Sequence, residues 1–238
     1  MTRVYLCQTV HLRRGRPRLV AAHAAVLAEA ARALFGLEYA PDPELLERRI
    51  AEAARAERYP SAVSGFVRIE LTAGGEERIV PAGVSLYDGY ALRSLMPEAS
   101  VVQYDLPFGE APTSVREAAA ELARCRAAQE GAGVALRCDA AGVCRTLDDA
   151  PLLAVAGRRV VLAPGERSVE RHLALLAVRA AGLDVSEEPF GCGALADFDE
   201  LFAVDHRGVT AVSRCGGRPY MALLAERVAR ALESLFAE

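Results

Sequence analysis

Lysine is absent from this chain of 238 residues, and all 28 of its basic side chains are arginine. A chain of this length ordinarily holds on the order of a dozen lysines. A genome-wide drift toward arginine and alanine would explain the bias, but drift alone should spare a lysine whose amine is a nucleophile. Arginine cannot replace such a lysine, because its guanidinium stays protonated at any working pH. The absence therefore excludes imine chemistry on a side-chain amine of this protein.

Metal-binding and membrane-spanning patterns are also lacking. The six cysteines form no C-x-x-C pair, and the four histidines show no spacing such as H-x-x-x-H. We therefore expect no metal site, and buried or free thiols as in cytosolic proteins. No apolar run approaches the roughly 18–20 residues of a membrane span, and the first residues, MTRV, lack the apolar segment of a signal peptide. With a net charge of −4, the expectation is a cytoplasmic protein that binds neither membrane nor nucleic acid.

What remains is an ordinary globular composition, with 52% hydrophobic and 25% charged residues. The hydrophobic periodicities predict an α+β chain. We expect strands at 3–12, just after Pro17, and at 65–72, 76–80, 83–95 and 99–104, with helices at 20–36 and from Asp42-Pro43 to about 58. In the second half we expect helices at 114–129, 168–181, 193–197 and 219–236, among strands at 133–138, 143–146, 151–155, 158–162, 183–188, 199–205 and 209–213. The Pro- and Gly-containing stretch 106–112 divides the chain into an N-terminal α+β domain, 1–108, and a C-terminal α/β domain, 112–238.

Two helix starts are marked by their capping residues. Asp42-Pro43 places a capping carboxylate before a proline at the first helical position. Ser114-x-x-Glu117 is a capping box, and the helix that it opens should turn Val115, Leu122 and Cys125 inward.

The order of short motifs resembles one enzyme family. GVALRCDAAGVCRT (133–146), followed by APLLAV (150–155), is similar to the pattern D-x-x-G-x-x-x-E and then N-L-F-x-V of the class IV (fold type IV) aminotransferases. Arg171 with Gly182 resembles the family's G-[IV]-T-R … G helix, and FDELF (198–202) resembles its A-D-E-V-F strand. In the first half, Gln8-Thr9, Gly15 and His23-x-x-x-Leu27 are similar to E-T … D-G … H-x-x-R-L, and Val67-Arg68-Ile69 resembles an interior strand arginine.

The resemblance implies a two-domain fold like that of D-amino acid aminotransferase, with a C-terminal pseudo-barrel and a cleft between the domains. Branched-chain aminotransferases and aminodeoxychorismate lyases share this fold, and the chain is closest in size to the lyase-like members. The family cofactor is pyridoxal phosphate (PLP), which a lysine binds as an imine. The family is usually homodimeric, so the resemblance implies a homodimer.

The residues that would hold PLP are replaced in this sequence. The lysine that lies about 26 residues before the D-x-x-G aspartate falls at Thr113, with Ser114 and Arg116 within alignment error. The glutamate that faces the pyridine nitrogen falls at Thr146, and an arginine that pairs with the phosphate falls at Val26. In the phosphate-binding turn, Ser168 and Val169 stand beside Glu166 and Glu170, whose charges oppose a phosphate.

These replacements favour a pseudoenzyme that keeps the fold for binding or interaction and holds no cofactor, with a small anionic ligand or a partner enzyme as its target. The alternative is a PLP-independent enzyme that reuses the cleft for a small anionic substrate. Arg68, Arg171 and His23 are the candidate ligand-binding residues for either hypothesis. For Arg68 and Arg171, an internal ion pair with Asp199 or Glu200 is the structural alternative.

Overall fold

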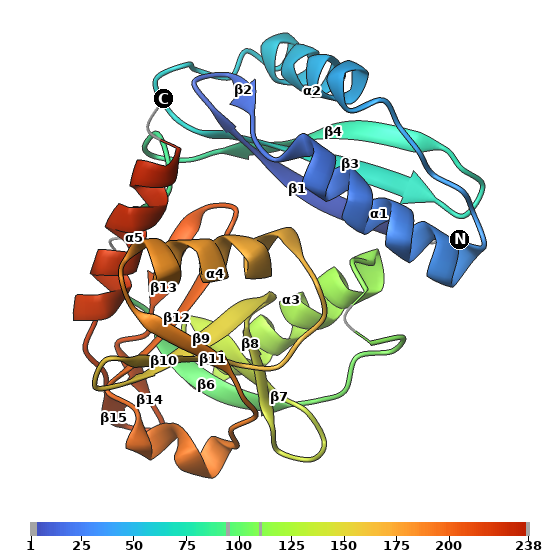
Figure 1. Ribbon diagram of the computed structural model, residues 1–238. Coiled ribbons are helices and arrows are strands. Elements are labelled where there is room, and N and C mark those ends of the chain that lie inside the picture. The colour runs from blue at the N-terminus through green and yellow to red at the C-terminus, as the bar shows by residue number, and fades with distance from the viewer. Residues whose placement is uncertain (1–3, 94–95, 110, 237–238) are drawn as a thin grey trace. The chain divides into compact units, whose positions relative to one another are not determined.

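The computed structural model describes residues 4–93, 96–109 and 111–236, and it divides into two compact units (Figure 1). The N-terminal unit holds the chain up to Gly89 together with Ala111–Val115. The C-terminal unit holds Tyr90–Glu110 and the chain from Arg116 onward. The division differs from the predicted one at 106–112, because the strand at 98–103 pairs in parallel with the strand that begins at Val134 and so belongs to the second sheet.

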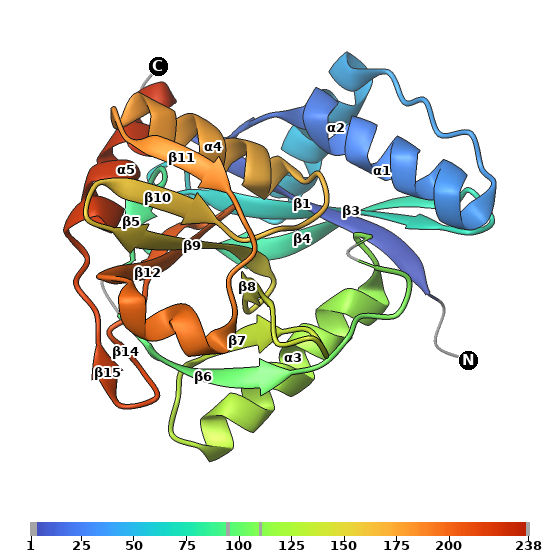
Figure 2. The same cartoon turned by 60° about the horizontal axis from the view of Figure 1, so that its bottom comes forward.

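The N-terminal unit is an antiparallel sheet in the order β2-β1-β3-β4, covered on one face by two helices (Figure 2). Its elements are β1 (Tyr5–Arg13), β2 (Arg16–Pro17), α1 (Val20–Phe35), α2 (Pro43–Ala56), β3 (Gly65–Thr72) and β4 (Glu77–Val84). Alternate residues of β1 and β3, such as Val10 and Ile69, pack against Leu27 of α1 and Ile50 of α2. These side chains are fully buried.

The predicted start of α2 and the end of α1 are both marked by capping residues. The carboxylate of Asp42 accepts hydrogen bonds from the backbone N–H groups of Glu44 and Leu45, at 2.9 and 3.4 Å, and Pro43 is the first helical residue. Helix α1 ends at Gly36, whose φ of 62° is in the left-handed region that glycine adopts without strain.

The predicted strand 83–95 is wrong over most of its length. β4 ends at Val84, and only Ala91–Leu92 (β5) is extended again among the described residues; 94–95 lie outside them. Residues 85–90 form a turn that is hydrogen-bonded to Ser64. Ser64 N donates to Tyr87 O at 3.0 Å, and Ser85 N donates to Ser64 O at 2.7 Å. Because the backbone is hydrogen-bonded in a turn here, it does not form the continuous strand that the apolar composition predicts.

The C-terminal unit is an 11-stranded mixed sheet in the order β15-β14-β6-β7-β8-β9-β12-β13-β5, with β10 beside β9 and β11 beside β10. It curls around its own core in Figure 2. The strands after β5 are β6 (Glu98–Gln103), β7 (Val134–Cys138), β8 (Cys144–Leu147), β9 (Ala150–Ala156), β10 (Arg159–Leu162), β11 (Asp184–Glu187), β12 (Glu200–Asp205), β13 (Gly208–Ala211), β14 (Arg214–Cys215) and β15 (Arg218–Pro219). The helices are α3 (Ser114–Gln129), α4 (Val169–Ala180), the short 3-10 helix η1 (Cys192–Asp197) and α5 (Leu223–Leu235).

Helix α3 begins at Ser114 as predicted, but its buried stripe is a different one. Ala123 and Ala127 are buried, whereas Leu122 is 72% exposed and Cys125 is exposed. The small methyl groups pack against Ala135, Val102 and Tyr104 of the sheet. The predicted inward stripe is therefore wrong for Leu122 and Cys125, because the close approach of α3 to the sheet suits alanine side chains. No helix of the described chain is both long and apolar enough to cross a membrane.

Candidate functional site

The D-x-x-G segment forms a tight turn between β7 and β8. Gly142 N donates to Asp139 O at 2.9 Å, and Gly142 has a φ of 79°. The Asp139 carboxylate accepts from Val143 N at 2.9 Å and from Arg145 Nε and an Arg145 terminal nitrogen at 2.9 and 2.7 Å. Burial alone would raise the pKa of Asp139, but the hydrogen bonds from Arg145 and Val143 outweigh it and lower this pKa. Asp139 is therefore a structural residue that holds the hairpin.

Thr146, on β8, has its hydroxyl committed to the protein. Its Oγ1 donates to Asp148 O at 2.9 Å and accepts from Arg137 Nε at 3.3 Å, and the side chain is only 4% exposed. The single hydroxyl proton is thus used internally.

A buried guanidinium, that of Arg137, lies beside Thr146. Arg137, on β7, is 4% exposed, and its Cζ lies over the Tyr104 ring, 5.8 Å from the centroid. Burial raises the pKa of Tyr104, and the charge of Arg137 only partly opposes the rise, so the phenol is neutral at pH 7. A protonated pyridine nitrogen needs an anionic acceptor. Thr146 offers only a hydroxyl, and the charged group that contacts this hydroxyl is a cation.

The turn before α4 also lacks the character of a phosphate site. Ser168 caps α4 by accepting from Arg171 N at 3.0 Å, so its hydroxyl oxygen already serves the helix, and Val169 is buried in the core. Glu170 stands in the first turn of α4. Burial raises the pKa of Glu170, and the carboxylates of Asp149 and Asp205 add to the rise, whereas Arg116 opposes it. Asp149 and Asp205 thus disfavour the single negative charge of an ionised Glu170, and they would disfavour the larger charge of a phosphate more strongly.

Arg116 is already engaged by one of these acids. Its Nε forms an ion pair with the Asp149 carboxylate, and a terminal nitrogen donates to Asp149 O at 2.9 Å. The residues of the C-terminal unit therefore do not fit PLP, at either the nitrogen or the phosphate end.

Thr113 and Ser114, the positions nearest the expected lysine, lie against β1 in the N-terminal unit. Thr113 is 6% exposed and forms an antiparallel bridge with Leu6, beside a bond from Cys7 N to Pro112 O at 2.8 Å. Ser114 Oγ accepts from Tyr5 N at 3.3 Å. This segment covers the backbone edge of β1 that the short strand β2 leaves open.

The three candidate ligand-binding residues form internal contacts. Arg68 pairs with Glu70 at 2.9 Å, and one of its terminal nitrogens lies 3.4 Å from Tyr5 Oη. His23 Nδ1 lies 2.9 Å from the amide oxygen of Gln8, and both side chains are buried. Gln8 lies on β1 with the residues that pack under α1, whereas Arg68 pairs across to Thr9 in the alternate register. The sheet therefore separates His23 from Arg68.

Arg171, in the C-terminal unit, donates to Ala163 O at 2.8 Å and forms an ion pair with Glu187. The suggested partners of Arg68 and Arg171, Asp199 and Glu200, are therefore wrong. Asp199 accepts from Gly157 N at 2.8 Å, and Glu200 accepts from the first backbone N–H groups of α5. Arg68 and Glu70 are two positions apart on β3 and share a face of that strand, whereas Arg171 of α4 and Glu187 of β11 meet only through the fold.

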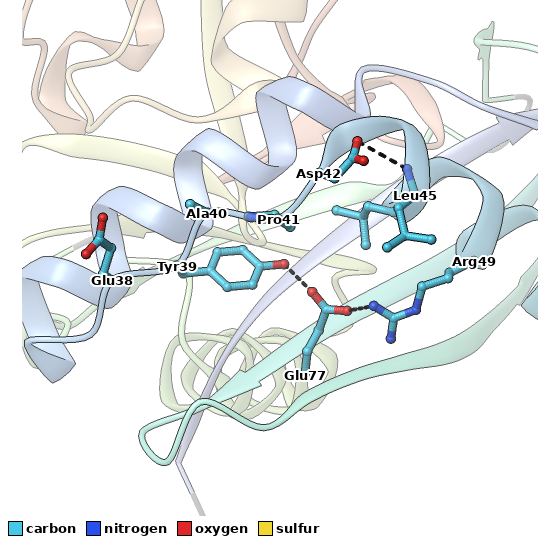
Figure 3. A pocket seen from close by; sticks show the side chains of 9 residues that line it. Glu38, Tyr39, Ala40, Pro41, Asp42, Leu45, Arg49 and Glu77 are labelled. Atoms are coloured by element: carbon cyan, nitrogen blue, oxygen red, sulfur yellow. Dashed lines mark hydrogen bonds and ion pairs between the residues drawn. The ribbon is translucent and has the colours of Figure 1, made fainter.

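A pocket that no sequence motif indicates lies at the start of α2 (Figure 3). Its polar groups satisfy each other: Tyr39 donates to Glu77, Arg49 pairs with the same carboxylate, and Asp42 caps α2. Burial, together with the Glu77 hydrogen bond, raises the pKa of Tyr39. The phenol therefore stays protonated at neutral pH, and Tyr39 is not a general base.

The cysteines depart from the expectation of free thiols. Cys138 and Cys192 are joined by a disulfide, whereas Cys125, Cys144 and Cys215 are free thiols. No spacing in the sequence marks the pair, because 54 residues separate the two positions. The absence of a metal site remains a prediction.

Comparisons with known proteins agree with the fold. Solved structures of a hypothetical aminotransferase from Mycobacterium tuberculosis, one of them in a PLP-bound form, match 97% of this chain and 88% of theirs, at 20% identity and a TM-score of 0.77. A putative 4-amino-4-deoxychorismate lyase from Legionella pneumophila matches 97% of this chain and 90% of its own at 15% identity, with a TM-score of 0.80. A putative branched-chain amino acid aminotransferase from Thermotoga maritima matches 99% and 86% at 14% identity, with a TM-score of 0.82.

The architecture is thus the mixed, curled-sheet fold of the class IV aminotransferases. The model of the family Amino-transferase class IV matches residues 6–215, and the chain belongs to that family, whose cofactor is PLP. No curated protein matches the sequence.

Proposed function

We propose that this protein is a non-catalytic member of the family, which retains the fold for binding or interaction and does not use PLP. The observation that carries the proposal is the state of Thr146. Its hydroxyl proton goes to Asp148 O, and the buried Arg137 guanidinium donates to the same hydroxyl oxygen. The lack of any lysine removes the imine as well.

The phosphate end supports the same conclusion. Glu170, Asp149 and Asp205 make a neighbourhood in which burial and like charges raise the pKa of Glu170. Each lost charge-assisted contact weakens binding by roughly 1.5–3 kcal/mol, or about 10- to 150-fold. With several contacts replaced, PLP would bind far more weakly than it does to a relative that keeps them.

The alternative of a PLP-independent enzyme has less support. Arg68 and Arg171, the charges it would use for an anionic substrate, are paired with Glu70 and Glu187 of the same chain. A substrate carboxylate would have to displace those partners.

The test is PLP binding by ultrafiltration and absorption spectroscopy. The aminotransferase from Brucella abortus, whose structure holds PLP, serves as the positive control. We expect no PLP to be retained and the absorption band to stay that of the free cofactor, while the control retains PLP. Retention of one equivalent at micromolar PLP would overturn the proposal.

A further inference from the structure

Two cysteines of the β7–β8 hairpin and a third from η1 meet in the C-terminal unit. Cys138 ends β7 and Cys144 begins β8, and the two are paired in the strand register. Cys192 begins η1. Their sulfurs all lie within 4.8 Å of one another, and Cys138 Sγ and Cys144 Sγ are 3.4 Å apart.

The backbone sets this arrangement. Cys144 N donates to Phe190 O at 2.9 Å, Cys192 N donates to Gly142 O at 3.2 Å, and Val143 forms a bridge with Gly191. The segment before η1 is thus held against the hairpin independently of its sulfur atoms. The backbone therefore brings Cys192 beside Cys138 and Cys144.

The three sulfurs differ in access to solvent. Cys138 and Cys144 are 0% exposed and belong to the apolar core, whereas Cys192 is half-buried at its edge. A reagent from solvent therefore reaches Cys192 first. The disulfide joins Cys192 to Cys138 rather than to Cys144.

We propose that Cys192 and Cys138 form a reversible thiol–disulfide site, which a small disulfide in solution oxidises through Cys192. In the first step the Cys192 thiolate attacks a disulfide R–S–S–R, forming Cys192–S–S–R and releasing RS⁻. In the second step the Cys138 sulfur attacks the Cys192 sulfur, displaces the second RS⁻ and passes its proton to it. The two cysteine thiols give up two electrons and two protons, and R–S–S–R becomes two R–SH.

Cys144 is a bystander in this scheme. Burial raises the pKa of Cys144 to about 12, with smaller contributions from Cys215 and Asp139, and the disulfide joins Cys192 to the neighbouring Cys138 instead. The same environment opposes a site for a thiophilic metal ion, which would need all three sulfurs as thiolates inside an apolar cluster.

The experiment equilibrates the reduced, full-length protein with glutathione buffers of increasing oxidised fraction. Remaining thiols are alkylated in denaturant and counted by mass spectrometry. At the oxidising end we expect four of the six thiols to be alkylated (6 − 2) and a Cys138–Cys192 link in the peptide map. The oxidised form should melt roughly 5–10 °C above the reduced form, because the link closes a long loop of the unfolded chain.

Variants separate the two steps. Cys144→Ala and the exposed control Cys125→Ala should still form the link. Cys138→Ala should accumulate a mixed disulfide on Cys192, and Cys192→Ala should form neither product. A Cys138–Cys144 link in the wild-type peptide map would overturn the proposal, as would six free thiols at every ratio. Binding of one Cd²⁺ per reduced chain that is lost in Cys144→Ala would show a metal site instead.

Discussion

Asp139 shows how a family motif can persist for structural reasons when the chemistry around it has changed. The aspartate and Gly142 form the β7–β8 turn with bonds to Val143 and Arg145, and none of these contacts requires a cofactor. The hydroxyl of Thr146, four positions after Gly142, bonds to Asp148 O and Arg137 Nε and not to the residues of this turn. The resemblance therefore survives best in the residues that shape the backbone.

Asp139→Asn should destabilise the protein by about 2 kcal/mol at pH 7, because charge-assisted bonds to Arg145 become neutral ones. The folded-state pKa of Asp139 lies below its ordinary value of 3.8. Its contribution is therefore present above that value and is lost as the pH falls through the folded-state pKa. Urea unfolding should show a wild-type advantage at pH 7 that shrinks at pH 3.

Asp184→Asn is the matched control, since Asp184 is exposed and should change stability by less than about 0.5 kcal/mol. An equal effect of both substitutions, or an Asp139 effect that does not depend on pH, would contradict the assignment.

At the scale of elements, α5 depends on a side chain from β12. The residue before α5, Ala222, offers no side-chain cap. Glu200, which is 2% exposed, accepts from Leu224 N at 2.8 and 3.0 Å and from Ala225 N at 2.9 Å. A buried carboxylate at a helix N-terminus satisfies free N–H groups and interacts favourably with the helix dipole. Glu200 of the FDELF motif thus has a structural role, because it caps the N-terminus of α5.

Glu200→Gln should lower the free energy of unfolding by about 2 kcal/mol, because the amide nitrogen faces N–H donors and the charge is lost. The control is Glu226→Gln in the same helical turn, whose exposed pair with Arg230 contributes roughly 0.3–0.5 kcal/mol. Thermal melts of both variants decide the point. Equal melting temperatures would rule out the capping role.

The same elements show what the sequence could and could not predict. Asp42-Pro43 marked the start of α2, and β3 has the predicted bounds 65–72, because capping chemistry and strand alternation are local signals. The alanine face of α3 and the turn at 85–90 depend on what packs against them. The replaced cofactor contacts rest on the sequence resemblance and stay predictions. Arg137 beside Thr146 depends on strand register, and Cys192 beside Cys138 depends on the path of the chain, neither of which is a local signal in one sequence.

At the scale of the whole molecule, we predict a homodimer. Several apolar side chains are exposed in the single chain, among them Leu86 at 95%, Phe108 at 78% and Leu122 at 72%. A second subunit that covers some of them would gain roughly 25 cal/mol for each Å² of apolar surface removed from water. Light scattering at micromolar concentration should give about 51 kDa, twice the 25.4 kDa chain. A mass near 25 kDa would refute the dimer.

The last prediction is that a restored lysine does not restore the family chemistry. Thr113→Lys, Ser114→Lys and Arg116→Lys should each fail to convert an amino donor in a single turnover at saturating PLP. In every variant Arg137 still lies beside Thr146, and the acids around Glu170 still oppose a phosphate. Two or more missing contacts at roughly 1.5–3 kcal/mol each cost at least a hundredfold in cofactor affinity. Thr113→Met controls for side-chain size at a buried position, and circular dichroism checks that each variant folds. Turnover by Thr113→Lys above the free-PLP background, with Thr113→Met at background, would mean that the site still supports catalysis and that the non-catalytic proposal is wrong.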